Sequence, residues 1–280
     1  MQKAFQVQTQ FLPEANLPEQ AGYFAVPGAN LYAVLHPVTA PIARVLLVGA
    51  FASERHFSYH AWVRWARYLA ARRVEVLRYD YRGIGESTGL FEEMSFEDWG
   101  EDVKILADQF ARRSPRVPLV LHGLELGAIL AARRFHEGTG DGLLLWSAPA
   151  NANQVLYSAL VEWAGTEQRD ERSEAQKKTS EYIRELEQGG LVEVQGYRWS
   201  GRLWRDSFDF DLPLGMEDEC VSRETYKKPV KIVQLGKDAV PIVRARLSSS
   251  EELNWLYSSN FDWVAGTVGL PPGGHNEGSD

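Results

Sequence analysis

The sequence predicts an α/β protein with a mostly parallel, doubly wound sheet and a helical lid inserted late in the chain. Short apolar runs rich in Val, Leu and Ile recur along the chain, and each is bounded by Gly, Pro or Asp. Amphipathic helical patterns separate these runs. Such an alternation of strands and helices implies right-handed crossovers within one sheet. The chain has 280 residues, 44% of them hydrophobic, which is enough for one large domain.

The apolar runs are continuous rather than alternating, which is typical of strands covered by helices on both faces of a sheet. Before them, Tyr23–Val26 and Leu31–His36 flank a turn at 27–30 and predict two paired strands. A last strand is expected at Phe261–Val264. The predicted buried strands are Val45–Val48, Val74–Tyr79, Pro118–Leu121, Leu143–Trp146 and Val230–Leu235.

Four helices are predicted between and after these strands. The clearest N-terminus lies at Ser95, because Asp98 follows three residues later in a spacing like that of a capping box. The predicted helices cover Trp62–Leu69, Phe96–Phe110 and Ala128–Phe135, and a fourth starts at Ser248 with Glu251.

The predicted domain organisation is a core made of residues 1–150 and 216–280, with a lid at 151–215. The lid interrupts the alternation between two predicted strands and is expected to be mostly helical, lying over the carboxyl ends of the strands. Its charged run, Glu167–Glu187, is expected to be a solvated helix face.

Composition excludes several classes of function. The net charge of -8 argues against a nucleic-acid partner, since phosphate binding needs clustered Lys and Arg. The single cysteine, Cys220, excludes an internal disulfide, and no stretch has the length of a membrane span. The segment Gly83-Ile84-Gly85 lacks dinucleotide-binding spacing, and no metal-ligand spacing occurs. We therefore expect a cytoplasmic protein without cofactor or metal.

The segment HGLELGA at 122–128 carries the strongest functional signal. It follows a predicted strand and leads directly into a helix, with the spacing Gly-x-nucleophile-x-Gly. The glycines permit a turn so tight that it pushes the residue at its tip into a pocket, beside the positive end of the helix. That residue is Glu125, where a serine is expected.

Two further residues follow Glu125 in the chain in the order nucleophile, acid, histidine, which is the order of a catalytic triad. Asp238 follows the Val230 strand, where a triad acid is expected, and His275 follows as the base. The backbone N–H groups of Phe51 and Leu126 fall where an oxyanion hole is expected. Together with DYRGIGES at 80–87, these features resemble the α/β-hydrolase superfamily over nearly the whole chain.

A closer resemblance rests on AFASE at 50–54, GLELGA at 123–128, LWSAP at 145–149 and VEVQGY at 192–197. These segments resemble the exosortase A system-associated hydrolase 2 family, which is grouped with serine-aminopeptidase-like hydrolases. The resemblance implies a bacterial protein encoded near exopolysaccharide and protein-sorting machinery.

The role of Glu125 leaves several alternatives open. Its carboxylate is the nucleophile, as Asp is in haloalkane dehalogenases, or a general base for water. Alternatively it pairs with His275 in a catalytically silent binding or scaffold protein, or a serine such as Ser53 or Ser147 has replaced it. The expected ligand of an active enzyme is a small ester, thioester or other acyl or alkyl compound. A homodimer is left open.

The assignment of His275 is also open, because a tail histidine without a role fits its position equally well. The predicted last strand leaves no room after it for a closing helix. His122, next to the elbow glycine, is expected to be buried beneath the site, and His56 and His60 are expected at the surface.

Overall fold

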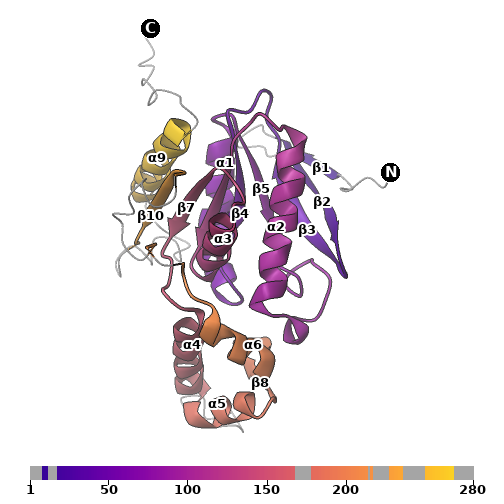
Figure 1. Ribbon diagram of the computed structural model, residues 1–280, viewed down its shortest axis with the longest axis vertical. Helices are drawn as coiled ribbons and strands as arrows, with labels where there is room; N and C mark the ends of the chain where they lie inside the picture. Colours follow the sequence, from indigo (N-terminus) through magenta and orange to yellow (C-terminus); the bar gives the residue numbers. More distant parts are fainter. Residues whose placement is uncertain are drawn as a thin grey trace.

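The computed structural model describes residues 8–11, 18–167, 178–213, 215–216, 227–235 and 250–267. One eight-stranded sheet in the order β1-β2-β3-β5-β4-β6-β7-β10 forms its centre (Figure 1). The pairs from β1 to β5 are antiparallel, and all later neighbours, from β5 to β10, are parallel. The predicted mostly parallel sheet is confirmed. Its strands are β1 Gln8–Phe11, β2 Pro18–Val26, β3 Ala29–His36, β4 Ala43–Val48, β5 Val74–Tyr79, β6 Leu119–Leu124, β7 Gly142–Trp146 and β10 Val230–Val233.

Helices cover both faces of the sheet, which explains the continuous apolar strands. In β4, Leu46 and Val48 pack with α2 (Phe96–Arg113) and α3 (Leu126–His136). The alternate residues of the same strand, Val45 and Leu47, pack with helices on the opposite face. Those helices are α1, Glu54–Ala70, and α9, Ser250–Thr267. None of the helices in the described ranges has the length and hydropathy needed to cross a bilayer.

The start of α2 confirms the predicted capping box. The Ser95 hydroxyl accepts a hydrogen bond from the Asp98 amide at 3.3 Å, and the Asp98 carboxylate accepts one from the Ser95 amide at 2.9 Å. One turn later, Asp102 pairs with Arg82 of the loop after β5. The same helix therefore holds the loop that carries the DYRGIGES segment.

The predicted strand at Phe261–Val264 is wrong, because these residues belong to α9. A four-residue apolar run does not by itself distinguish a strand from a buried helix. The buried positions of α9 include Leu256, Asn260 and Val264, four residues apart, which is the spacing of one helix face. The expectation that the chain leaves no room for a closing helix is wrong for the same reason, since α9 packs against α1.

Between β7 and β10 the chain forms a separate layer beyond the end of the sheet (Figure 1). Only Tyr182 and Leu186 of α5 are buried, so the described part of the charged run is largely solvated. A two-stranded hairpin, which the sequence patterns did not indicate, follows this helix. The elements are α4 Ala152–Glu167, α5 Thr179–Glu187, β8 Leu191–Val194, β9 Tyr197–Ser200, α6 Gly201–Asp206 and the 3-10 turn η2 Ser207–Asp209.

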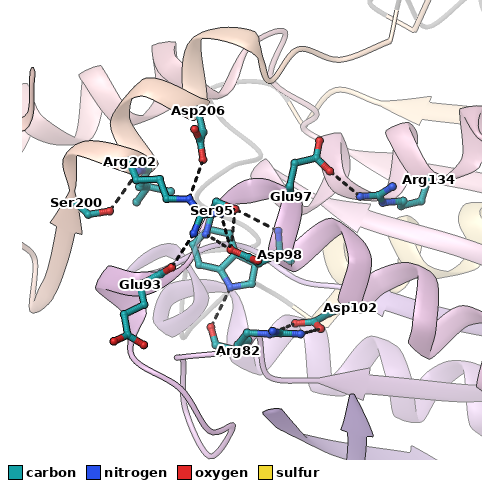
Figure 2. A network of polar contacts seen from close by, with 12 residues as sticks. Arg82, Glu93, Ser95, Glu97, Asp98, Asp102, Arg134, Ser200, Arg202 and Asp206 are labelled. Carbon is teal, nitrogen blue, oxygen red and sulfur yellow. Dashed lines mark hydrogen bonds and ion pairs between the residues drawn. The ribbon is translucent and has the colours of Figure 1, made fainter. Parts of the chain in front are cut away.

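Arg202 of α6 joins this layer to the core (Figure 2). Its guanidinium donates to the Ser95 hydroxyl at 3.1 Å and to the Glu93 carbonyl at 3.2 Å, and it lies 3.4 Å from the Asp98 carboxylate. Arg198 of β9 adds an ion pair with Glu92 at 2.8 Å. Several contacts at the N-terminus of α2 thus hold the inserted layer in one position.

Candidate functional site

Glu125 occupies a sharp turn between β6 and α3. Its backbone has φ 52° and ψ -126°, a conformation that side-chain-bearing residues rarely adopt. The Glu125 amide donates to the Trp146 carbonyl of β7 at 3.0 Å, and the Glu125 carbonyl accepts from the Ala128 amide at 2.8 Å. Hydrogen bonds on both sides hold the strained residue in place. Strain of this kind costs about 1–3 kcal/mol and clusters at functional sites.

The two glycines of the turn are sterically required. A Cβ on Gly123 would lie 2.3 Å from the Cα of Ala128, and a Cβ on Gly127 would lie 2.1 Å from the carbonyl oxygen of Gly49. Neither neighbour is a flexible side chain that could move aside. The predicted elbow is therefore present, because the sheet approaches the first turn of α3 too closely for any other residue.

A pocket of about 250 Å³ opens at this elbow. The core contributes Glu125, Leu126 and Phe51, the last from the loop after β4. The inserted layer contributes one side of α4 and Trp199 of β9, so the pocket lies between the two layers. Its lining residues are Phe51, Ala52, Ser53, Glu54, Glu125, Leu126, Ser147, Pro149, Val155, Leu156, Ser158, Ala159, Glu162 and Trp199.

The structure brings together Glu125, Phe51 and Leu126, three of the five predicted site residues. Leu126 is the first residue of α3, so its N–H has no acceptor within the helix. Neither this N–H nor that of Phe51 donates to another residue in the described ranges. Asp238 and His275 lie outside the described residues.

Two further carboxylates, Glu54 and Glu162, line the pocket but were not predicted from the sequence as site residues. Glu54 begins α1, directly after the loop of Phe51. Glu162 shares a helix face with Val155 and Ala159, at i+7 and i+3 respectively. The spacing was visible in the sequence, but the direction in which α4 presents that face depends on how the inserted layer docks.

Both serines considered as replacements, Ser53 and Ser147, line the pocket. The Ser53 hydroxyl donates to the side-chain oxygen of Gln195 in the turn between β8 and β9. The Ser147 hydroxyl is buried without a hydrogen bond to the described part of the chain, and its backbone φ is 48°. Within that same part of the chain, no three His, Cys, Asp or Glu side chains gather as metal ligands would.

His122 lies beneath the elbow, buried as predicted. Its Nδ1 accepts a hydrogen bond from Trp65 Nε1 at 2.9 Å, and the rings of Trp62 and Trp146 lie 4.9 and 4.5 Å away. Burial lowers the pKa of the imidazole well below its usual value, so the ring stays neutral. A second buried histidine, His36, behaves similarly: burial, together with Arg78 and Arg67, lowers its pKa to about 3.

These two histidines predict that stability declines in mild acid. Above their ordinary pKa of ~6.5 neither the folded nor the unfolded chain protonates them; below it, only the unfolded chain binds the protons. Each histidine should therefore lower the free energy of unfolding by about 1.4 kcal/mol between pH 7.5 and 5.5. Urea unfolding at both pH values measures this loss. The His36→Gln variant should lose about 1.4 kcal/mol less than the unchanged protein; an identical loss would contradict the assignment.

A family model described as serine aminopeptidase, S33, matches residues 46–185. The chain belongs to this family. It is an α/β-hydrolase by family and by fold. A search of curated proteins finds no match.

Three solved structures of other proteins are similar to this chain in fold. Monoglyceride lipase from Saccharomyces cerevisiae, in complex with a substrate analogue, superposes with TM-score 0.56 at 15% identity, over 88% of this chain and 94% of that one. Est1E from Butyrivibrio proteoclasticus, with ferulic acid bound, superposes with TM-score 0.55 at 17% identity, over 88% of this chain and 99% of that one. The α/β-hydrolase GrgF from Penicillium superposes with TM-score 0.57 at 17% identity, over 91% of this chain and 100% of that one. At these identities the likeness concerns the fold alone.

Proposed function

We propose that this chain is a hydrolase in which the Glu125 carboxylate attacks a small acyl or alkyl compound. The observation that carries the proposal is the strain of the elbow: residue 125 has φ 52° and ψ -126° and lines a pocket, although it is not a serine. A backbone conformation that costs stability persists where the surrounding structure enforces it, and such positions cluster at active sites.

With an alkyl ligand, an Oε of Glu125 forms a bond to the electrophilic carbon, and the leaving group departs with the electron pair of the bond that breaks. Water then attacks the Cδ of the resulting ester, which releases an alcohol and regenerates the carboxylate. An acyl ligand would give a mixed anhydride by the same attack. The N–H groups of Phe51 and Leu126 would stabilise the negative charge that develops on the carbonyl oxygen when water attacks. Asp238 and His275 would activate that water.

The lining of the pocket supports a small, neutral or cationic ligand. Val155, Leu156 and Trp199 supply apolar surface, and the volume of about 250 Å³ limits the size of the ligand. Glu54 and Glu162 add two carboxylates to that of Glu125, and no Lys or Arg lines the pocket in the described part of the chain. An anionic ligand would be repelled. In this proposal residues 151–215 serve as the lid that excludes water.

Turnover of styrene oxide in ¹⁸O-labelled water tests the mechanism, and p-nitrophenyl acetate tests separately whether an acyl ligand is turned over. Water that attacks Cδ leaves ¹⁸O in the carboxylate of Glu125, and mass spectrometry of the peptide that contains residue 125 detects it. Glu54 and Glu162 in the same pocket are internal controls and should stay unlabelled. Glu125→Gln should lower the rate by about 10⁴-fold or more.

Three other outcomes would contradict the proposal, each in favour of a different alternative. Turnover that needs Glu125 but leaves no label would point to a general base for water. Turnover that survives Glu125→Gln would point to a serine such as Ser147. Saturable binding without turnover would favour the silent binding or scaffold protein, whose proposed partners are exopolysaccharide and protein-sorting machinery.

A further inference from the structure

A second cavity, of about 350 Å³, lies away from the elbow, between α1 and the antiparallel part of the sheet. Its floor is formed where β2, β3 and β5 lie side by side: Ala21 pairs with Val34, and Val34 pairs with Arg78. Its wall is one face of α1. The lining residues are Glu19, Ala21, Tyr32, Val34, Tyr59, His60, Val63, Arg64, Arg67 and Arg78. None of them lines the pocket at Glu125.

Positive charge converges on this cavity from two elements. Arg64 and Arg67 lie three residues apart on α1, and Arg78 reaches the cavity from β5. Among the described residues, Glu19 is the one carboxylate in the lining, and it lies 3.1 Å from the Nε of Arg67 and 3.7 Å from a terminal nitrogen of Arg78. Three guanidinium groups and one carboxylate leave a net charge of about +2, in a chain whose net charge is -8.

Much of the donor capacity of these guanidinium groups is unused. Within the described part of the chain, Arg64 makes no hydrogen bond or ion pair, and Arg67 uses only its Nε. Arg78 donates to His36 at 3.3 Å and to the Tyr59 hydroxyl at 3.4 Å. The neighbouring His36 is buried and lies 3.5 Å from Glu19. Burial, together with Arg78 and Arg67, lowers the pKa of its imidazole to about 3, so His36 is neutral and does not change the net charge of the cavity.

We propose that this cavity binds a small organic phosphomonoester, with the phosphate held by Arg64, Arg67 and Arg78. A guanidinium group presents a planar fork of donors that matches phosphate oxygens, and the net charge of about +2 balances a phosphate dianion. A cavity of about 350 Å³ falls in the range of small-molecule sites and exceeds what bare phosphate fills. The rings of Tyr32 and Tyr59 supply surface for the organic part.

Isothermal titration calorimetry with phenyl phosphate tests this proposal, and benzoate, which has the same ring with a carboxylate, is the comparison. The titration is made well above the second pKa of the phosphate, ~6, so that the dianion is present. We expect saturable binding of phenyl phosphate that is about tenfold weaker in Arg64→Gln, since a charge-assisted hydrogen bond is lost. Arg64 makes no hydrogen bond or ion pair within the described ranges, and its side chain is exposed, so this variant should fold normally.

Arg72→Gln is the matched control, because Arg72 lies two residues after the end of α1 and packs over the ring of Tyr68 outside the cavity. It should bind phenyl phosphate as the unchanged protein does. The proposal is overturned if phenyl phosphate does not bind saturably, if Arg64→Gln binds it unchanged, or if both variants weaken binding equally. Benzoate that binds as tightly as phenyl phosphate would overturn the assignment to phosphate.

Discussion

Glu125→Ser is expected to convert a protein that fluorophosphonate probes do not label at residue 125 into one that they label to completion. The substitution places a hydroxyl at the tip of an elbow whose backbone already has the required strain, beside the amides of Phe51 and Leu126. If Asp238 and His275 complete the site, the labelling rate should exceed that of Glu125→Ala by about 10³-fold or more. Gel fluorescence measures the rate, and peptide mass spectrometry locates the label.

Two further variants in the Glu125→Ser background make this result specific. Ser147→Ala should leave the labelling intact, since Ser147 lines the same pocket but is not at the elbow. His275→Ala should abolish it, because the serine then lacks its base. If Glu125→Ser is folded but unlabelled, Asp238 and His275 do not assemble at the elbow, and the proposed triad is wrong.

Asp102→Asn is expected to destabilise the fold by about 3–5 kcal/mol, a large part of the stability of an ordinary domain. Asp102 is 0% exposed, and its carboxylate accepts a hydrogen bond from the Nε of Arg82 at 3.0 Å. Burial raises the pKa of this carboxyl, although Arg82 opposes the shift. Burial of this ion pair therefore costs free energy. Removal of one charge costs more, because it leaves the other charge buried without a partner.

Urea unfolding of a matched variant on the same helix distinguishes the effect of burial on stability from the effect of losing a charge. Asp108 pairs with Lys104 at 3.1 Å, but both side chains are nearly half exposed. Asp108→Asn should therefore change the free energy of unfolding by about 0.5 kcal/mol or less. The double replacement Arg82→Met with Asp102→Leu should recover most of the loss, because no unpaired charge remains. Equal effects of Asp102→Asn and Asp108→Asn would contradict this account.

Local patterns predicted the elements of the fold well where one period was unambiguous. The strand Val74–Tyr79 is observed with the predicted bounds, and the capping box at Ser95 and Asp98 forms as expected. The prediction failed at Phe261–Val264, where four apolar residues fitted either element. The hairpin of β8 and β9 was missed, since its strands have only four residues each.

The candidate site was partly visible in the sequence. Gly123, Glu125 and Gly127 could be placed on a strand–turn–helix unit because the spacing of glycines reports a local backbone requirement. Glu162 could not be placed at the pocket, since its contribution depends on how α4 packs across the elbow. The arginine-lined cavity was likewise hidden, because Arg78 meets Arg64 and Arg67 only when β5 lies beneath α1.

The amino-acid sequence alone determined that this chain builds a doubly wound sheet and bends sharply at an acidic residue. Both follow from local chemistry: the period of apolar side chains, and glycines where a Cβ would collide with backbone. Only the tertiary structure decided that an inserted layer walls the pocket of Glu125 with Glu162 and Trp199, and that three arginines share a second cavity. Those groups come from segments far apart in the chain, so no local sequence pattern predicts that they lie close together.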